Sequence, residues 1–257
     1  MFVDPLAKTF ANWSPYNYVL DNPIRLVDPD GKAPTPYEAA IIASHVYGGK
    51  NAPKLVGGWK VSNHKFEDVN LRNSDTGLQS NVYERTDKET GVTEYVYASA
   101  GTFEWEDVKA DIKQLYNGKS EQYSESVANA EIISQEVGTN ELTYVGHSLG
   151  GGLASANSLK TGDAAITFNA AALSGKTVKN LNLTGNLKTI TAYIVNGEFV
   201  DFMQGKIGME AAGTIISLPA PNKYWAPDPV GSPINMKNRI KNHKIGVVID
   251  QLENYHY

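Results

Sequence analysis

A glycine-flanked serine motif is the part of the sequence best suited to chemistry. It consists of Gly146, His147, Ser148, Leu149 and Gly150. A serine that attacks an ester carbonyl must stand on a sharp turn between a strand and a helix, where the crowded backbone needs small residues two positions before and after it. The apolar run 142–145 and the small residues 151–159 suit that strand and helix. We therefore predict Ser148 as the nucleophile and the Leu149 N–H as one oxyanion donor.

A serine nucleophile needs a histidine as its general base. The chain has five histidines, His45, His64, His147, His243 and His256. His147 lies inside the serine motif, where its side chain is expected to point away from the serine and to be structural. His243 stands where a loop is expected to enter the last helix, after the last predicted strand. This position keeps the chain order serine, acid, histidine, and we predict His243 as the base.

Two carboxylates compete for the acid of the triad. Glu198 and Asp201 both follow a strand predicted at 190–195. The acid belongs just after such a strand, where it orients the imidazole and stabilises its charged form. Either residue could instead be an ordinary carboxylate at a helix start, interacting with the helix dipole. The residues alone leave both candidates open.

A second oxyanion donor is expected at the end of an earlier strand. The run 93–100 alternates like a strand and leads into Gly101 and Thr102. An oxyanion hole needs two preorganised donors, and the Thr102 N–H is the candidate for the second. The alternative is an ordinary turn at the end of a strand.

The predicted elements alternate between strand and helix. Thr35, Pro36 and Glu38 form a capping box with proline at the first helical position, which predicts a helix start. Strands are expected near 55–61, 78–84, 93–100, 142–145, 165–168 and 190–195, and helices at 35–48, 104–116, 122–137, 149–159 and 245–252. This alternation predicts an α/β fold with a mostly parallel central sheet and helices on both faces.

Composition excludes several classes of protein. The 257 residues carry a net charge of -5, so no basic surface for nucleic acid is expected. Cysteine is absent, and no histidine pair or acidic calcium loop is present; we expect no metal and no cofactor. The first residues lack the basic start and apolar run of a signal peptide, and no run is long enough to span a bilayer.

Two parts of the chain together resemble class 3 lipases. In that family a strand ending in Gly-Thr precedes a tryptophan and an aspartate, and a GHSLGG motif follows; residues 101–107 and 146–151 match this order. Ala100 stands where the family usually has arginine. The family's Asp-x-Val register falls on 198–200 and favours Glu198 over Asp201. The resemblance implies an α/β-hydrolase fold.

A narrower resemblance, over about residues 93–253, is to lipase-like toxin domains of bacterial secreted effectors, including type VI-type phospholipase effectors. GHSLGGGLASANS at 146–158 and AITFNAAAL at 165–173 are typical of them. The resemblance implies hydrolysis of acyl esters of lipids. An apolar face within 103–115 stands where such lipases carry a lid; the alternative is plain helix core.

The N-terminal residues resemble a different family. SPYNYVLDNPIRLVDPDGK, at 14–32, is similar to the closing segment of the RHS-repeat core, after which a variable toxin domain begins. We therefore expect a 1–32 RHS tail and a 33–257 lipase-like domain; the alternative is a simple extended arm. The combination implies an antibacterial phospholipase, of A1 or A2 type, delivered into a target cell, with a cognate immunity protein and an RHS shell as partners.

Other functions remain open. The same triad suits a triacylglycerol lipase or a general carboxylesterase, and also a peptidase, thioesterase or acyltransferase. A catalytically inactive binding module is the alternative outside enzymes.

Overall fold

The fold is built on a central sheet. The structure, a computed structural model, describes residues 34–50, 52–88, 91–101, 120–138, 142–206, 208–224 and 232–254. The strands are β1 (Lys60–Val61), β2 (Arg72–Asn73), β3 (Leu78–Thr86), β4 (Thr93–Ser99), β5 (Leu142–His147), β6 (Ala164–Phe168), β7 (Ile190–Val195) and β8 (Thr214–Leu218). Within the described ranges the sheet has the order β1-β3-β4-β5-β6-β7-β8, with β2 paired to β3.

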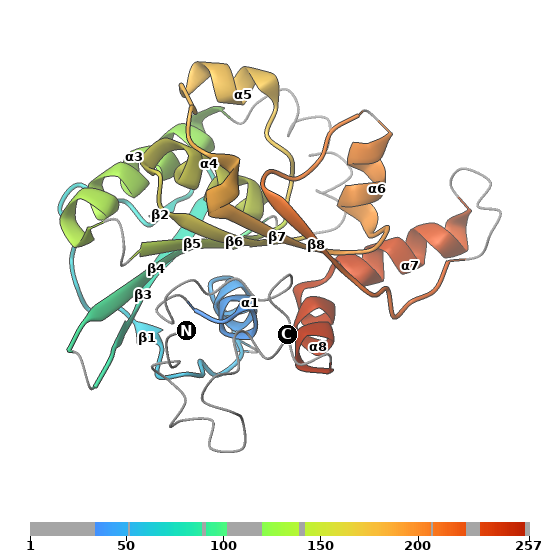
Figure 1. Ribbon diagram of the computed structural model, residues 1–257, viewed down its shortest axis with the longest axis horizontal. Coiled ribbons are helices and arrows are strands. Elements are labelled where there is room, and N and C mark those ends of the chain that lie inside the picture. The colour runs from blue at the N-terminus through green and yellow to red at the C-terminus, as the bar shows by residue number, and fades with distance from the viewer. Residues whose placement is uncertain are drawn as a thin grey trace, which may run out of the picture.

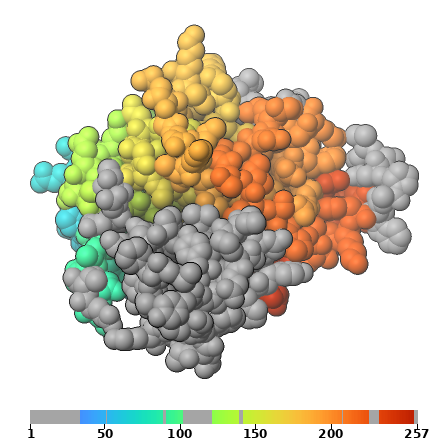
Figure 2. Space-filling view, viewed as in Figure 1, coloured from blue at the N-terminus to red at the C-terminus, as the bar shows by residue number. Residues whose placement is uncertain are grey.

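Helices cover both faces of this sheet. They are α1 (Pro36–His45), α3 (Ser120–Val137), α4 (Leu149–Thr161), α5 (Gly175–Asn180), the 3-10 helix η3 (Leu187–Thr189), α6 (Phe199–Gly205), α7 (Pro233–His243) and α8 (Ile245–Asn254). In Figure 1, α3, α4 and α5 lie on one side of the sheet, and α1 and α8 lie on the other. The space-filling view shows α5 projecting from the top of the first layer (Figure 2).

The direction of the strands follows from their connections. Strands β4 to β8 pair parallel, each to the next, whereas β1, β2 and β4 pair antiparallel with β3. Parallel neighbours need crossover connections, which place helices on the faces of the sheet and bury its strands on both sides. The predicted α/β fold with a mostly parallel sheet is confirmed.

Successive side chains of the central strands belong alternately to two hydrophobic clusters. In β4, Val96 and Ala98 belong to the cluster beneath α1 and α8, whereas Tyr97 belongs to the cluster beneath α3 and α4. In β5, Tyr144 belongs to the cluster beneath α3 and α4, and Val145 to the cluster beneath α1 and α8. Successive strand residues point to opposite faces, so each strand contributes to both cores and holds the two helical layers on one frame.

The helix α1 shows how the sequence fixes its own start. Thr35 accepts from the Glu38 N–H, and the Glu38 carboxylate accepts from the Thr35 N–H. This is the predicted capping box, which satisfies two N–H groups that the first turn leaves free.

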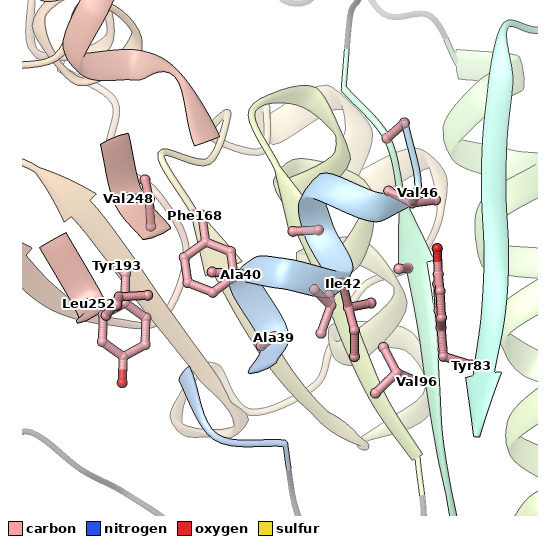
Figure 3. Close-up of a cluster of buried hydrophobic side chains, with 14 of the residues drawn as sticks. Ala39, Ala40, Ile42, Val46, Tyr83, Val96, Phe168, Tyr193, Val248 and Leu252 are labelled. Carbon is pink, nitrogen blue, oxygen red and sulfur yellow. The ribbon is translucent and has the colours of Figure 1, made fainter. Parts of the chain in front are cut away.

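Figure 3 shows α1 packed into its cluster. Ala40 lies beside Phe168 of β6, Ile42 points toward Val96 of β4, and Leu252 of α8 lies beside Tyr193 of β7. Small alanines on α1 allow this close approach. The segment after α1 is thereby fixed close to the carboxyl ends of the central strands.

Several local predictions were wrong. The strand expected at 55–61 is limited to Lys60–Val61, because Gly57 and Gly58 adopt φ values of 62° and 81°, outside the strand region. His243 ends the helix α7 rather than lying in a loop. The elements β2, α5, η3, α6, α7 and β8 were not predicted. The helix expected at 104–116 lies outside the described residues.

Candidate active site

Ser148 stands on a strained turn between β5 and α4. Its φ is 59° and its ψ is −124°, a conformation that costs energy for any residue other than glycine. The surrounding backbone holds it there. The Ser148 N–H donates to the Phe168 carbonyl at 3.0 Å, and the Ser148 carbonyl accepts from Gly151 at 3.0 Å and from Ala171 at 2.9 Å. The sequence motif is thus a sharp strand-to-helix turn.

The glycines around Ser148 are required by space. A Cβ on Gly146 would overlap the backbone of Gly150, and a Cβ on Gly150 would overlap the backbone of Ser99 at the end of β4. A Cβ on Gly151 would come within 2.6 Å of the Cβ of Ala170. Only bare backbone lets α4 begin this close to the sheet.

Three side chains form a continuous hydrogen-bonded line. His243 Nε2 lies 2.9 Å from Ser148 Oγ, and His243 Nδ1 contacts Glu198 Oε2 in a short hydrogen bond. The three residues are buried, with Ser148 the most exposed at 7%. With the proton on Nδ1, the imidazole donates to the carboxylate and accepts from the serine hydroxyl, as a general base must.

Glu198 caps a helix and contacts the candidate base with the same carboxylate. It is the N-cap of α6, where its Oε2 accepts from the Val200 N–H at 2.8 Å and its Oε1 from the Asp201 N–H at 2.6 Å. The same carboxylate faces His243. These two backbone donors fix its orientation toward the imidazole.

Asp201, the other candidate acid, lies in the first turn of α6. Burial raises the pKa of its carboxyl, and the negative charge of Glu198 raises it further. Its backbone N–H serves Glu198. The structure therefore brings Glu198, and not Asp201, to Nδ1 of His243.

His147 has a position separate from the reacting hydroxyl. Its Nε2 lies 2.7 Å from the carbonyl oxygen of His243, and its Nδ1 lies 2.8 Å from Tyr47 Oη. Burial, with a smaller contribution from the neighbouring His243, lowers its pKa to about 3. A neutral ring held between two partners matches the structural role expected for it.

The oxyanion side of the serine is described in part. Leu149 is the first residue of α4 and is buried. Gly101, just past β4, lies against the serine, since a Cβ on Gly101 would come within 3.0 Å of Ser148 Cβ and 2.6 Å of the His147 carbonyl. Thr102 and the apolar face within 103–115 lie outside the described residues, so both assignments stay predictions.

Arg239 fixes the turn that carries the acid, and sequence reasoning missed it. Its Nη1 donates to the Gly197 carbonyl at 2.5 Å. Its guanidinium lies over the rings of Phe202 and Tyr224, 3.8 Å and 4.5 Å from their centroids. Arg239 precedes His243 by four residues on α7, which puts both on one helix face. That spacing would have been a signal had α7 been predicted as a helix.

Asn169 also contacts the backbone of His243. Its Nδ2 donates to the His243 carbonyl at 3.0 Å, and its Oδ1 accepts from the Val195 N–H at 2.9 Å, at the end of β7. Its φ of 44° places it in the left-handed region, where asparagine is tolerated. The ends of β6 and β7 are thereby tied to α7.

Within the described part of the chain, no three metal-ligating side chains gather into a candidate metal site. No helix in these ranges combines the length and the apolar character needed to cross a membrane.

A known family matches most of the chain. The model of the phospholipase-like family described as "Tle-like phospholipase domain" matches residues 38–221. The chain belongs to this family. The extracellular phospholipase A1 of Serratia liquefaciens is 34% identical over 152 residues, which cover 57% of this chain and 45% of that protein. The chain thus spans less than half the length of that relative.

Solved lipases share the fold. The Rhizomucor miehei lipase in its propeptide complex gives a TM-score of 0.51 at 14% identity, covering 77% of this chain and 70% of that one. A triacylglycerol lipase of Penicillium expansum gives a TM-score of 0.47 at 13% identity, covering 73% and 79%. The sheet order, the parallel strands and the Rhizomucor lipase together establish the α/β-hydrolase fold.

Proposed function

We propose that this protein is a serine hydrolase that cleaves acyl ester bonds of phospholipids, with Ser148 as nucleophile, His243 as base and Glu198 as acid. The observation that carries the proposal is the hydrogen-bonded line from Glu198 through His243 to Ser148, on a strained turn, in a member of the Tle-like phospholipase domain family.

The proposed reaction has two steps. As Ser148 Oγ attacks the ester carbonyl, His243 Nε2 takes its proton, and Glu198 stabilises the imidazolium that forms. The N–H groups of Leu149 and Thr102 would hold the oxyanion. His243 then passes the proton to the leaving alcohol oxygen, here of a lysophospholipid. A water molecule next gives a proton to His243 and attacks the acyl ester, and His243 returns that proton to Ser148 Oγ as the fatty acid leaves.

Two observations favour phospholipid over other esters. The matching family is described as phospholipase-like, and the relative from Serratia liquefaciens is named a phospholipase A1. Triacylglycerol and small esters are the second candidate substrates, since the same triad suits them as well.

The biological role we propose is that of an antibacterial effector. It rests on the resemblance of residues 14–32 to the end of an RHS core and of the later residues to effector lipases. In this proposal the protein is carried by an RHS shell into a target cell, where it attacks membrane phospholipid, and an immunity protein protects the producing cell.

The test of activity compares wild type with Ser148→Ala on vesicles of phosphatidylethanolamine and phosphatidylglycerol. Released fatty acid and lysophospholipid are measured by mass spectrometry. We expect kcat to fall by about 10⁴ to 10⁶-fold in the variant. Triacylglycerol emulsion, a thioester and an amide are assayed in parallel, and preferential turnover of any of them would replace phospholipid as the substrate.

The enzyme proposal itself has a clear contradiction. Unchanged hydrolysis by Ser148→Ala, or no turnover of any substrate by folded wild type, would overturn it in favour of another nucleophile or a binding module. The effector role is tested separately, by directing both proteins to the periplasm of a bacterial host. Growth arrest by wild type and not by Ser148→Ala is expected.

A further inference from the structure

Tyr47 connects two parts of the site that are far apart in the sequence. It lies two residues after α1, which ends at His45. Its hydroxyl oxygen accepts from the Gly101 N–H at 3.0 Å and lies 2.8 Å from His147 Nδ1. Gln79 of β3 fixes the backbone at this point, since its Nε2 donates to the Tyr47 carbonyl at 2.9 Å. The hydroxyl is therefore held in place before any substrate binds.

The direction of these hydrogen bonds follows from their partners. The carbonyl oxygen of His243 can only accept, so His147 carries its proton on Nε2. Burial keeps the His147 ring neutral by lowering its pKa to about 3, which leaves a lone pair on Nδ1. Tyr47 must then donate its hydroxyl proton to Nδ1, and burial raises the pKa of this hydroxyl, so the proton is present.

The result is a directed chain of three hydrogen bonds. It runs from the Gly101 N–H to Tyr47, from Tyr47 to His147, and from His147 to the carbonyl of His243. One end is the end of β4, in contact with Ser148 on the side where the oxyanion is expected. The other end is the backbone of the base.

We propose that Tyr47 is a positioning residue that fixes the oxyanion side of Ser148 and the base relative to each other. The inference rests on the proposed function of the same site. Tyr47 also fixes the tautomer of His147, because only a hydrogen-bond donor at Nδ1 complements a neutral ring that donates from Nε2.

The chain of three hydrogen bonds matters most in the transition state. When His243 takes the serine proton it becomes a cation, and the His147 ring lies only 4.8 Å away, between ring centroids. A neutral His147 avoids repulsion with this cation. The loss of Tyr47 should therefore lower kcat and leave KM nearly unchanged, because His147 and His243 interact with charge that develops only during the reaction.

The first experiment measures Tyr47→Phe on p-nitrophenyl butyrate, with Tyr37→Phe as the matched control. Tyr37 lies on α1, is half-buried and packs against the same cluster. We expect kcat of Tyr47→Phe to fall about 10 to 100-fold, with KM nearly unchanged, and Tyr37→Phe to match wild type. An unchanged kcat in Tyr47→Phe, with active wild type, would overturn the inference while leaving the proposed function intact.

A double-mutant cycle tests whether Tyr47 acts through His147. Tyr47→Phe, His147→Gln and the double variant are compared by kcat and by the rate of labelling with a fluorophosphonate. Tyr47 and His147 belong to the same series of hydrogen bonds. The kcat of the double variant should therefore fall about as much as that of the worse single variant. Losses that multiply would show independent action and overturn the proposal.

A measurement on wild type covers the case in which a variant does not fold. Nitrogen-15 NMR of the histidine rings distinguishes the two tautomers of a neutral imidazole. We expect His147 to carry its proton on Nε2, and Nδ1 to stay unprotonated at pH 5. A proton on Nδ1 of His147 would contradict the direction of the chain and the role of Tyr47.

Discussion

At the residue scale, one carboxylate serves two structural purposes. Glu198 caps α6 through the backbone N–H groups of Val200 and Asp201, and it also faces His243. Two fixed donors orient the carboxylate toward the imidazole. An oriented carboxylate stabilises the imidazolium that forms in a reacting triad. Helix capping and the geometry of the triad therefore depend on the same side chain.

Substituting the two candidate acids separates their roles. Glu198→Gln keeps the shape of the side chain and removes its charge, so we expect kcat to fall by about 10³ to 10⁴-fold. Asp201→Asn should cost less than about tenfold, because its side chain does not stand at Nδ1. Steady-state kinetics on p-nitrophenyl butyrate, with melting temperatures, measure both. A larger loss in Asp201→Asn would refute the assignment of Glu198.

The buried His147 predicts a pH dependence of stability. Its pKa falls from 6.5 in the unfolded chain to about 3 in the folded protein. Between these values the unfolded chain binds a proton that the folded protein does not. The free energy of unfolding should therefore fall as pH falls, by up to about 1.4 kcal/mol per pH unit from this one group.

Urea denaturation of wild type and His147→Gln at pH 4, 5 and 6 measures this effect. The variant should show the shallower dependence on pH, whatever its stability at pH 7. His64→Gln is the control, since His64 lies at the surface with 42% of its side chain exposed. Equal slopes in wild type and His147→Gln would be inconsistent with a buried, neutral His147.

At the element scale, α7 connects His243 to the turn that precedes Glu198. It carries His243 at its last residue and Arg239 one turn earlier, and Arg239 donates to the Gly197 carbonyl immediately before Glu198. Tyr224 extends the connection by donating to the Asn196 carbonyl at 2.9 Å. The helix α7 thus sets the distance between His243 and Glu198.

Replacing Arg239 should loosen this connection. Arg239→Met removes a charged hydrogen bond and two ring contacts, so the free energy of unfolding should fall by about 1–3 kcal/mol. The kcat should fall as well, because the acid turn loses its support. Lys241→Met, at an exposed position of the same helix, is the matched control. Identical urea curves and kcat for the two variants would exclude a role for Arg239.

At the scale of the whole molecule, the site lies along one edge of the sheet. Ser148 follows β5, Glu198 follows β7 and Gly101 follows β4, all parallel neighbours or near neighbours in the sheet. Their carboxyl ends therefore meet at a common edge, where α/β proteins place their ligands. The two helical layers hold this edge, with α1 and α8 packed against one another and the sheet (Figure 3).

We propose residues 33–257 as the catalytic unit, since the described triad elements and the family match all lie within it. A protein without residues 1–32 should fold and keep the kcat of the full chain on p-nitrophenyl butyrate. Deletion of residues 245–257 is the contrasting control, because it removes the buried Val248 and Leu252 and should give insoluble protein. Inactivity of a folded protein lacking residues 1–32 would contradict the proposed boundary.

Sequence alone determined those features that depend on neighbouring residues. The turn at Ser148 follows from glycines two positions away, the start of α1 from Thr35 and Glu38, and the strands β5 and β7 from short apolar runs. These signals arise from backbone sterics and local hydrogen bonds, which act over a few residues. The polar helix α7 and the exposed strand β8 gave no clear period, and they were missed for that reason.

Tertiary structure decided what depends on distant residues. Glu198 and Asp201 are three positions apart, and only the placement of α7 shows which one meets His243. Tyr47 reaches His147 across 100 residues, and Arg239 reaches Gly197 across 42. Such contacts leave no local pattern, because folding joins these segments through packing of whole helices on the sheet. The proposed nucleophile was therefore readable in the sequence, whereas the residues that orient its proposed partners were not.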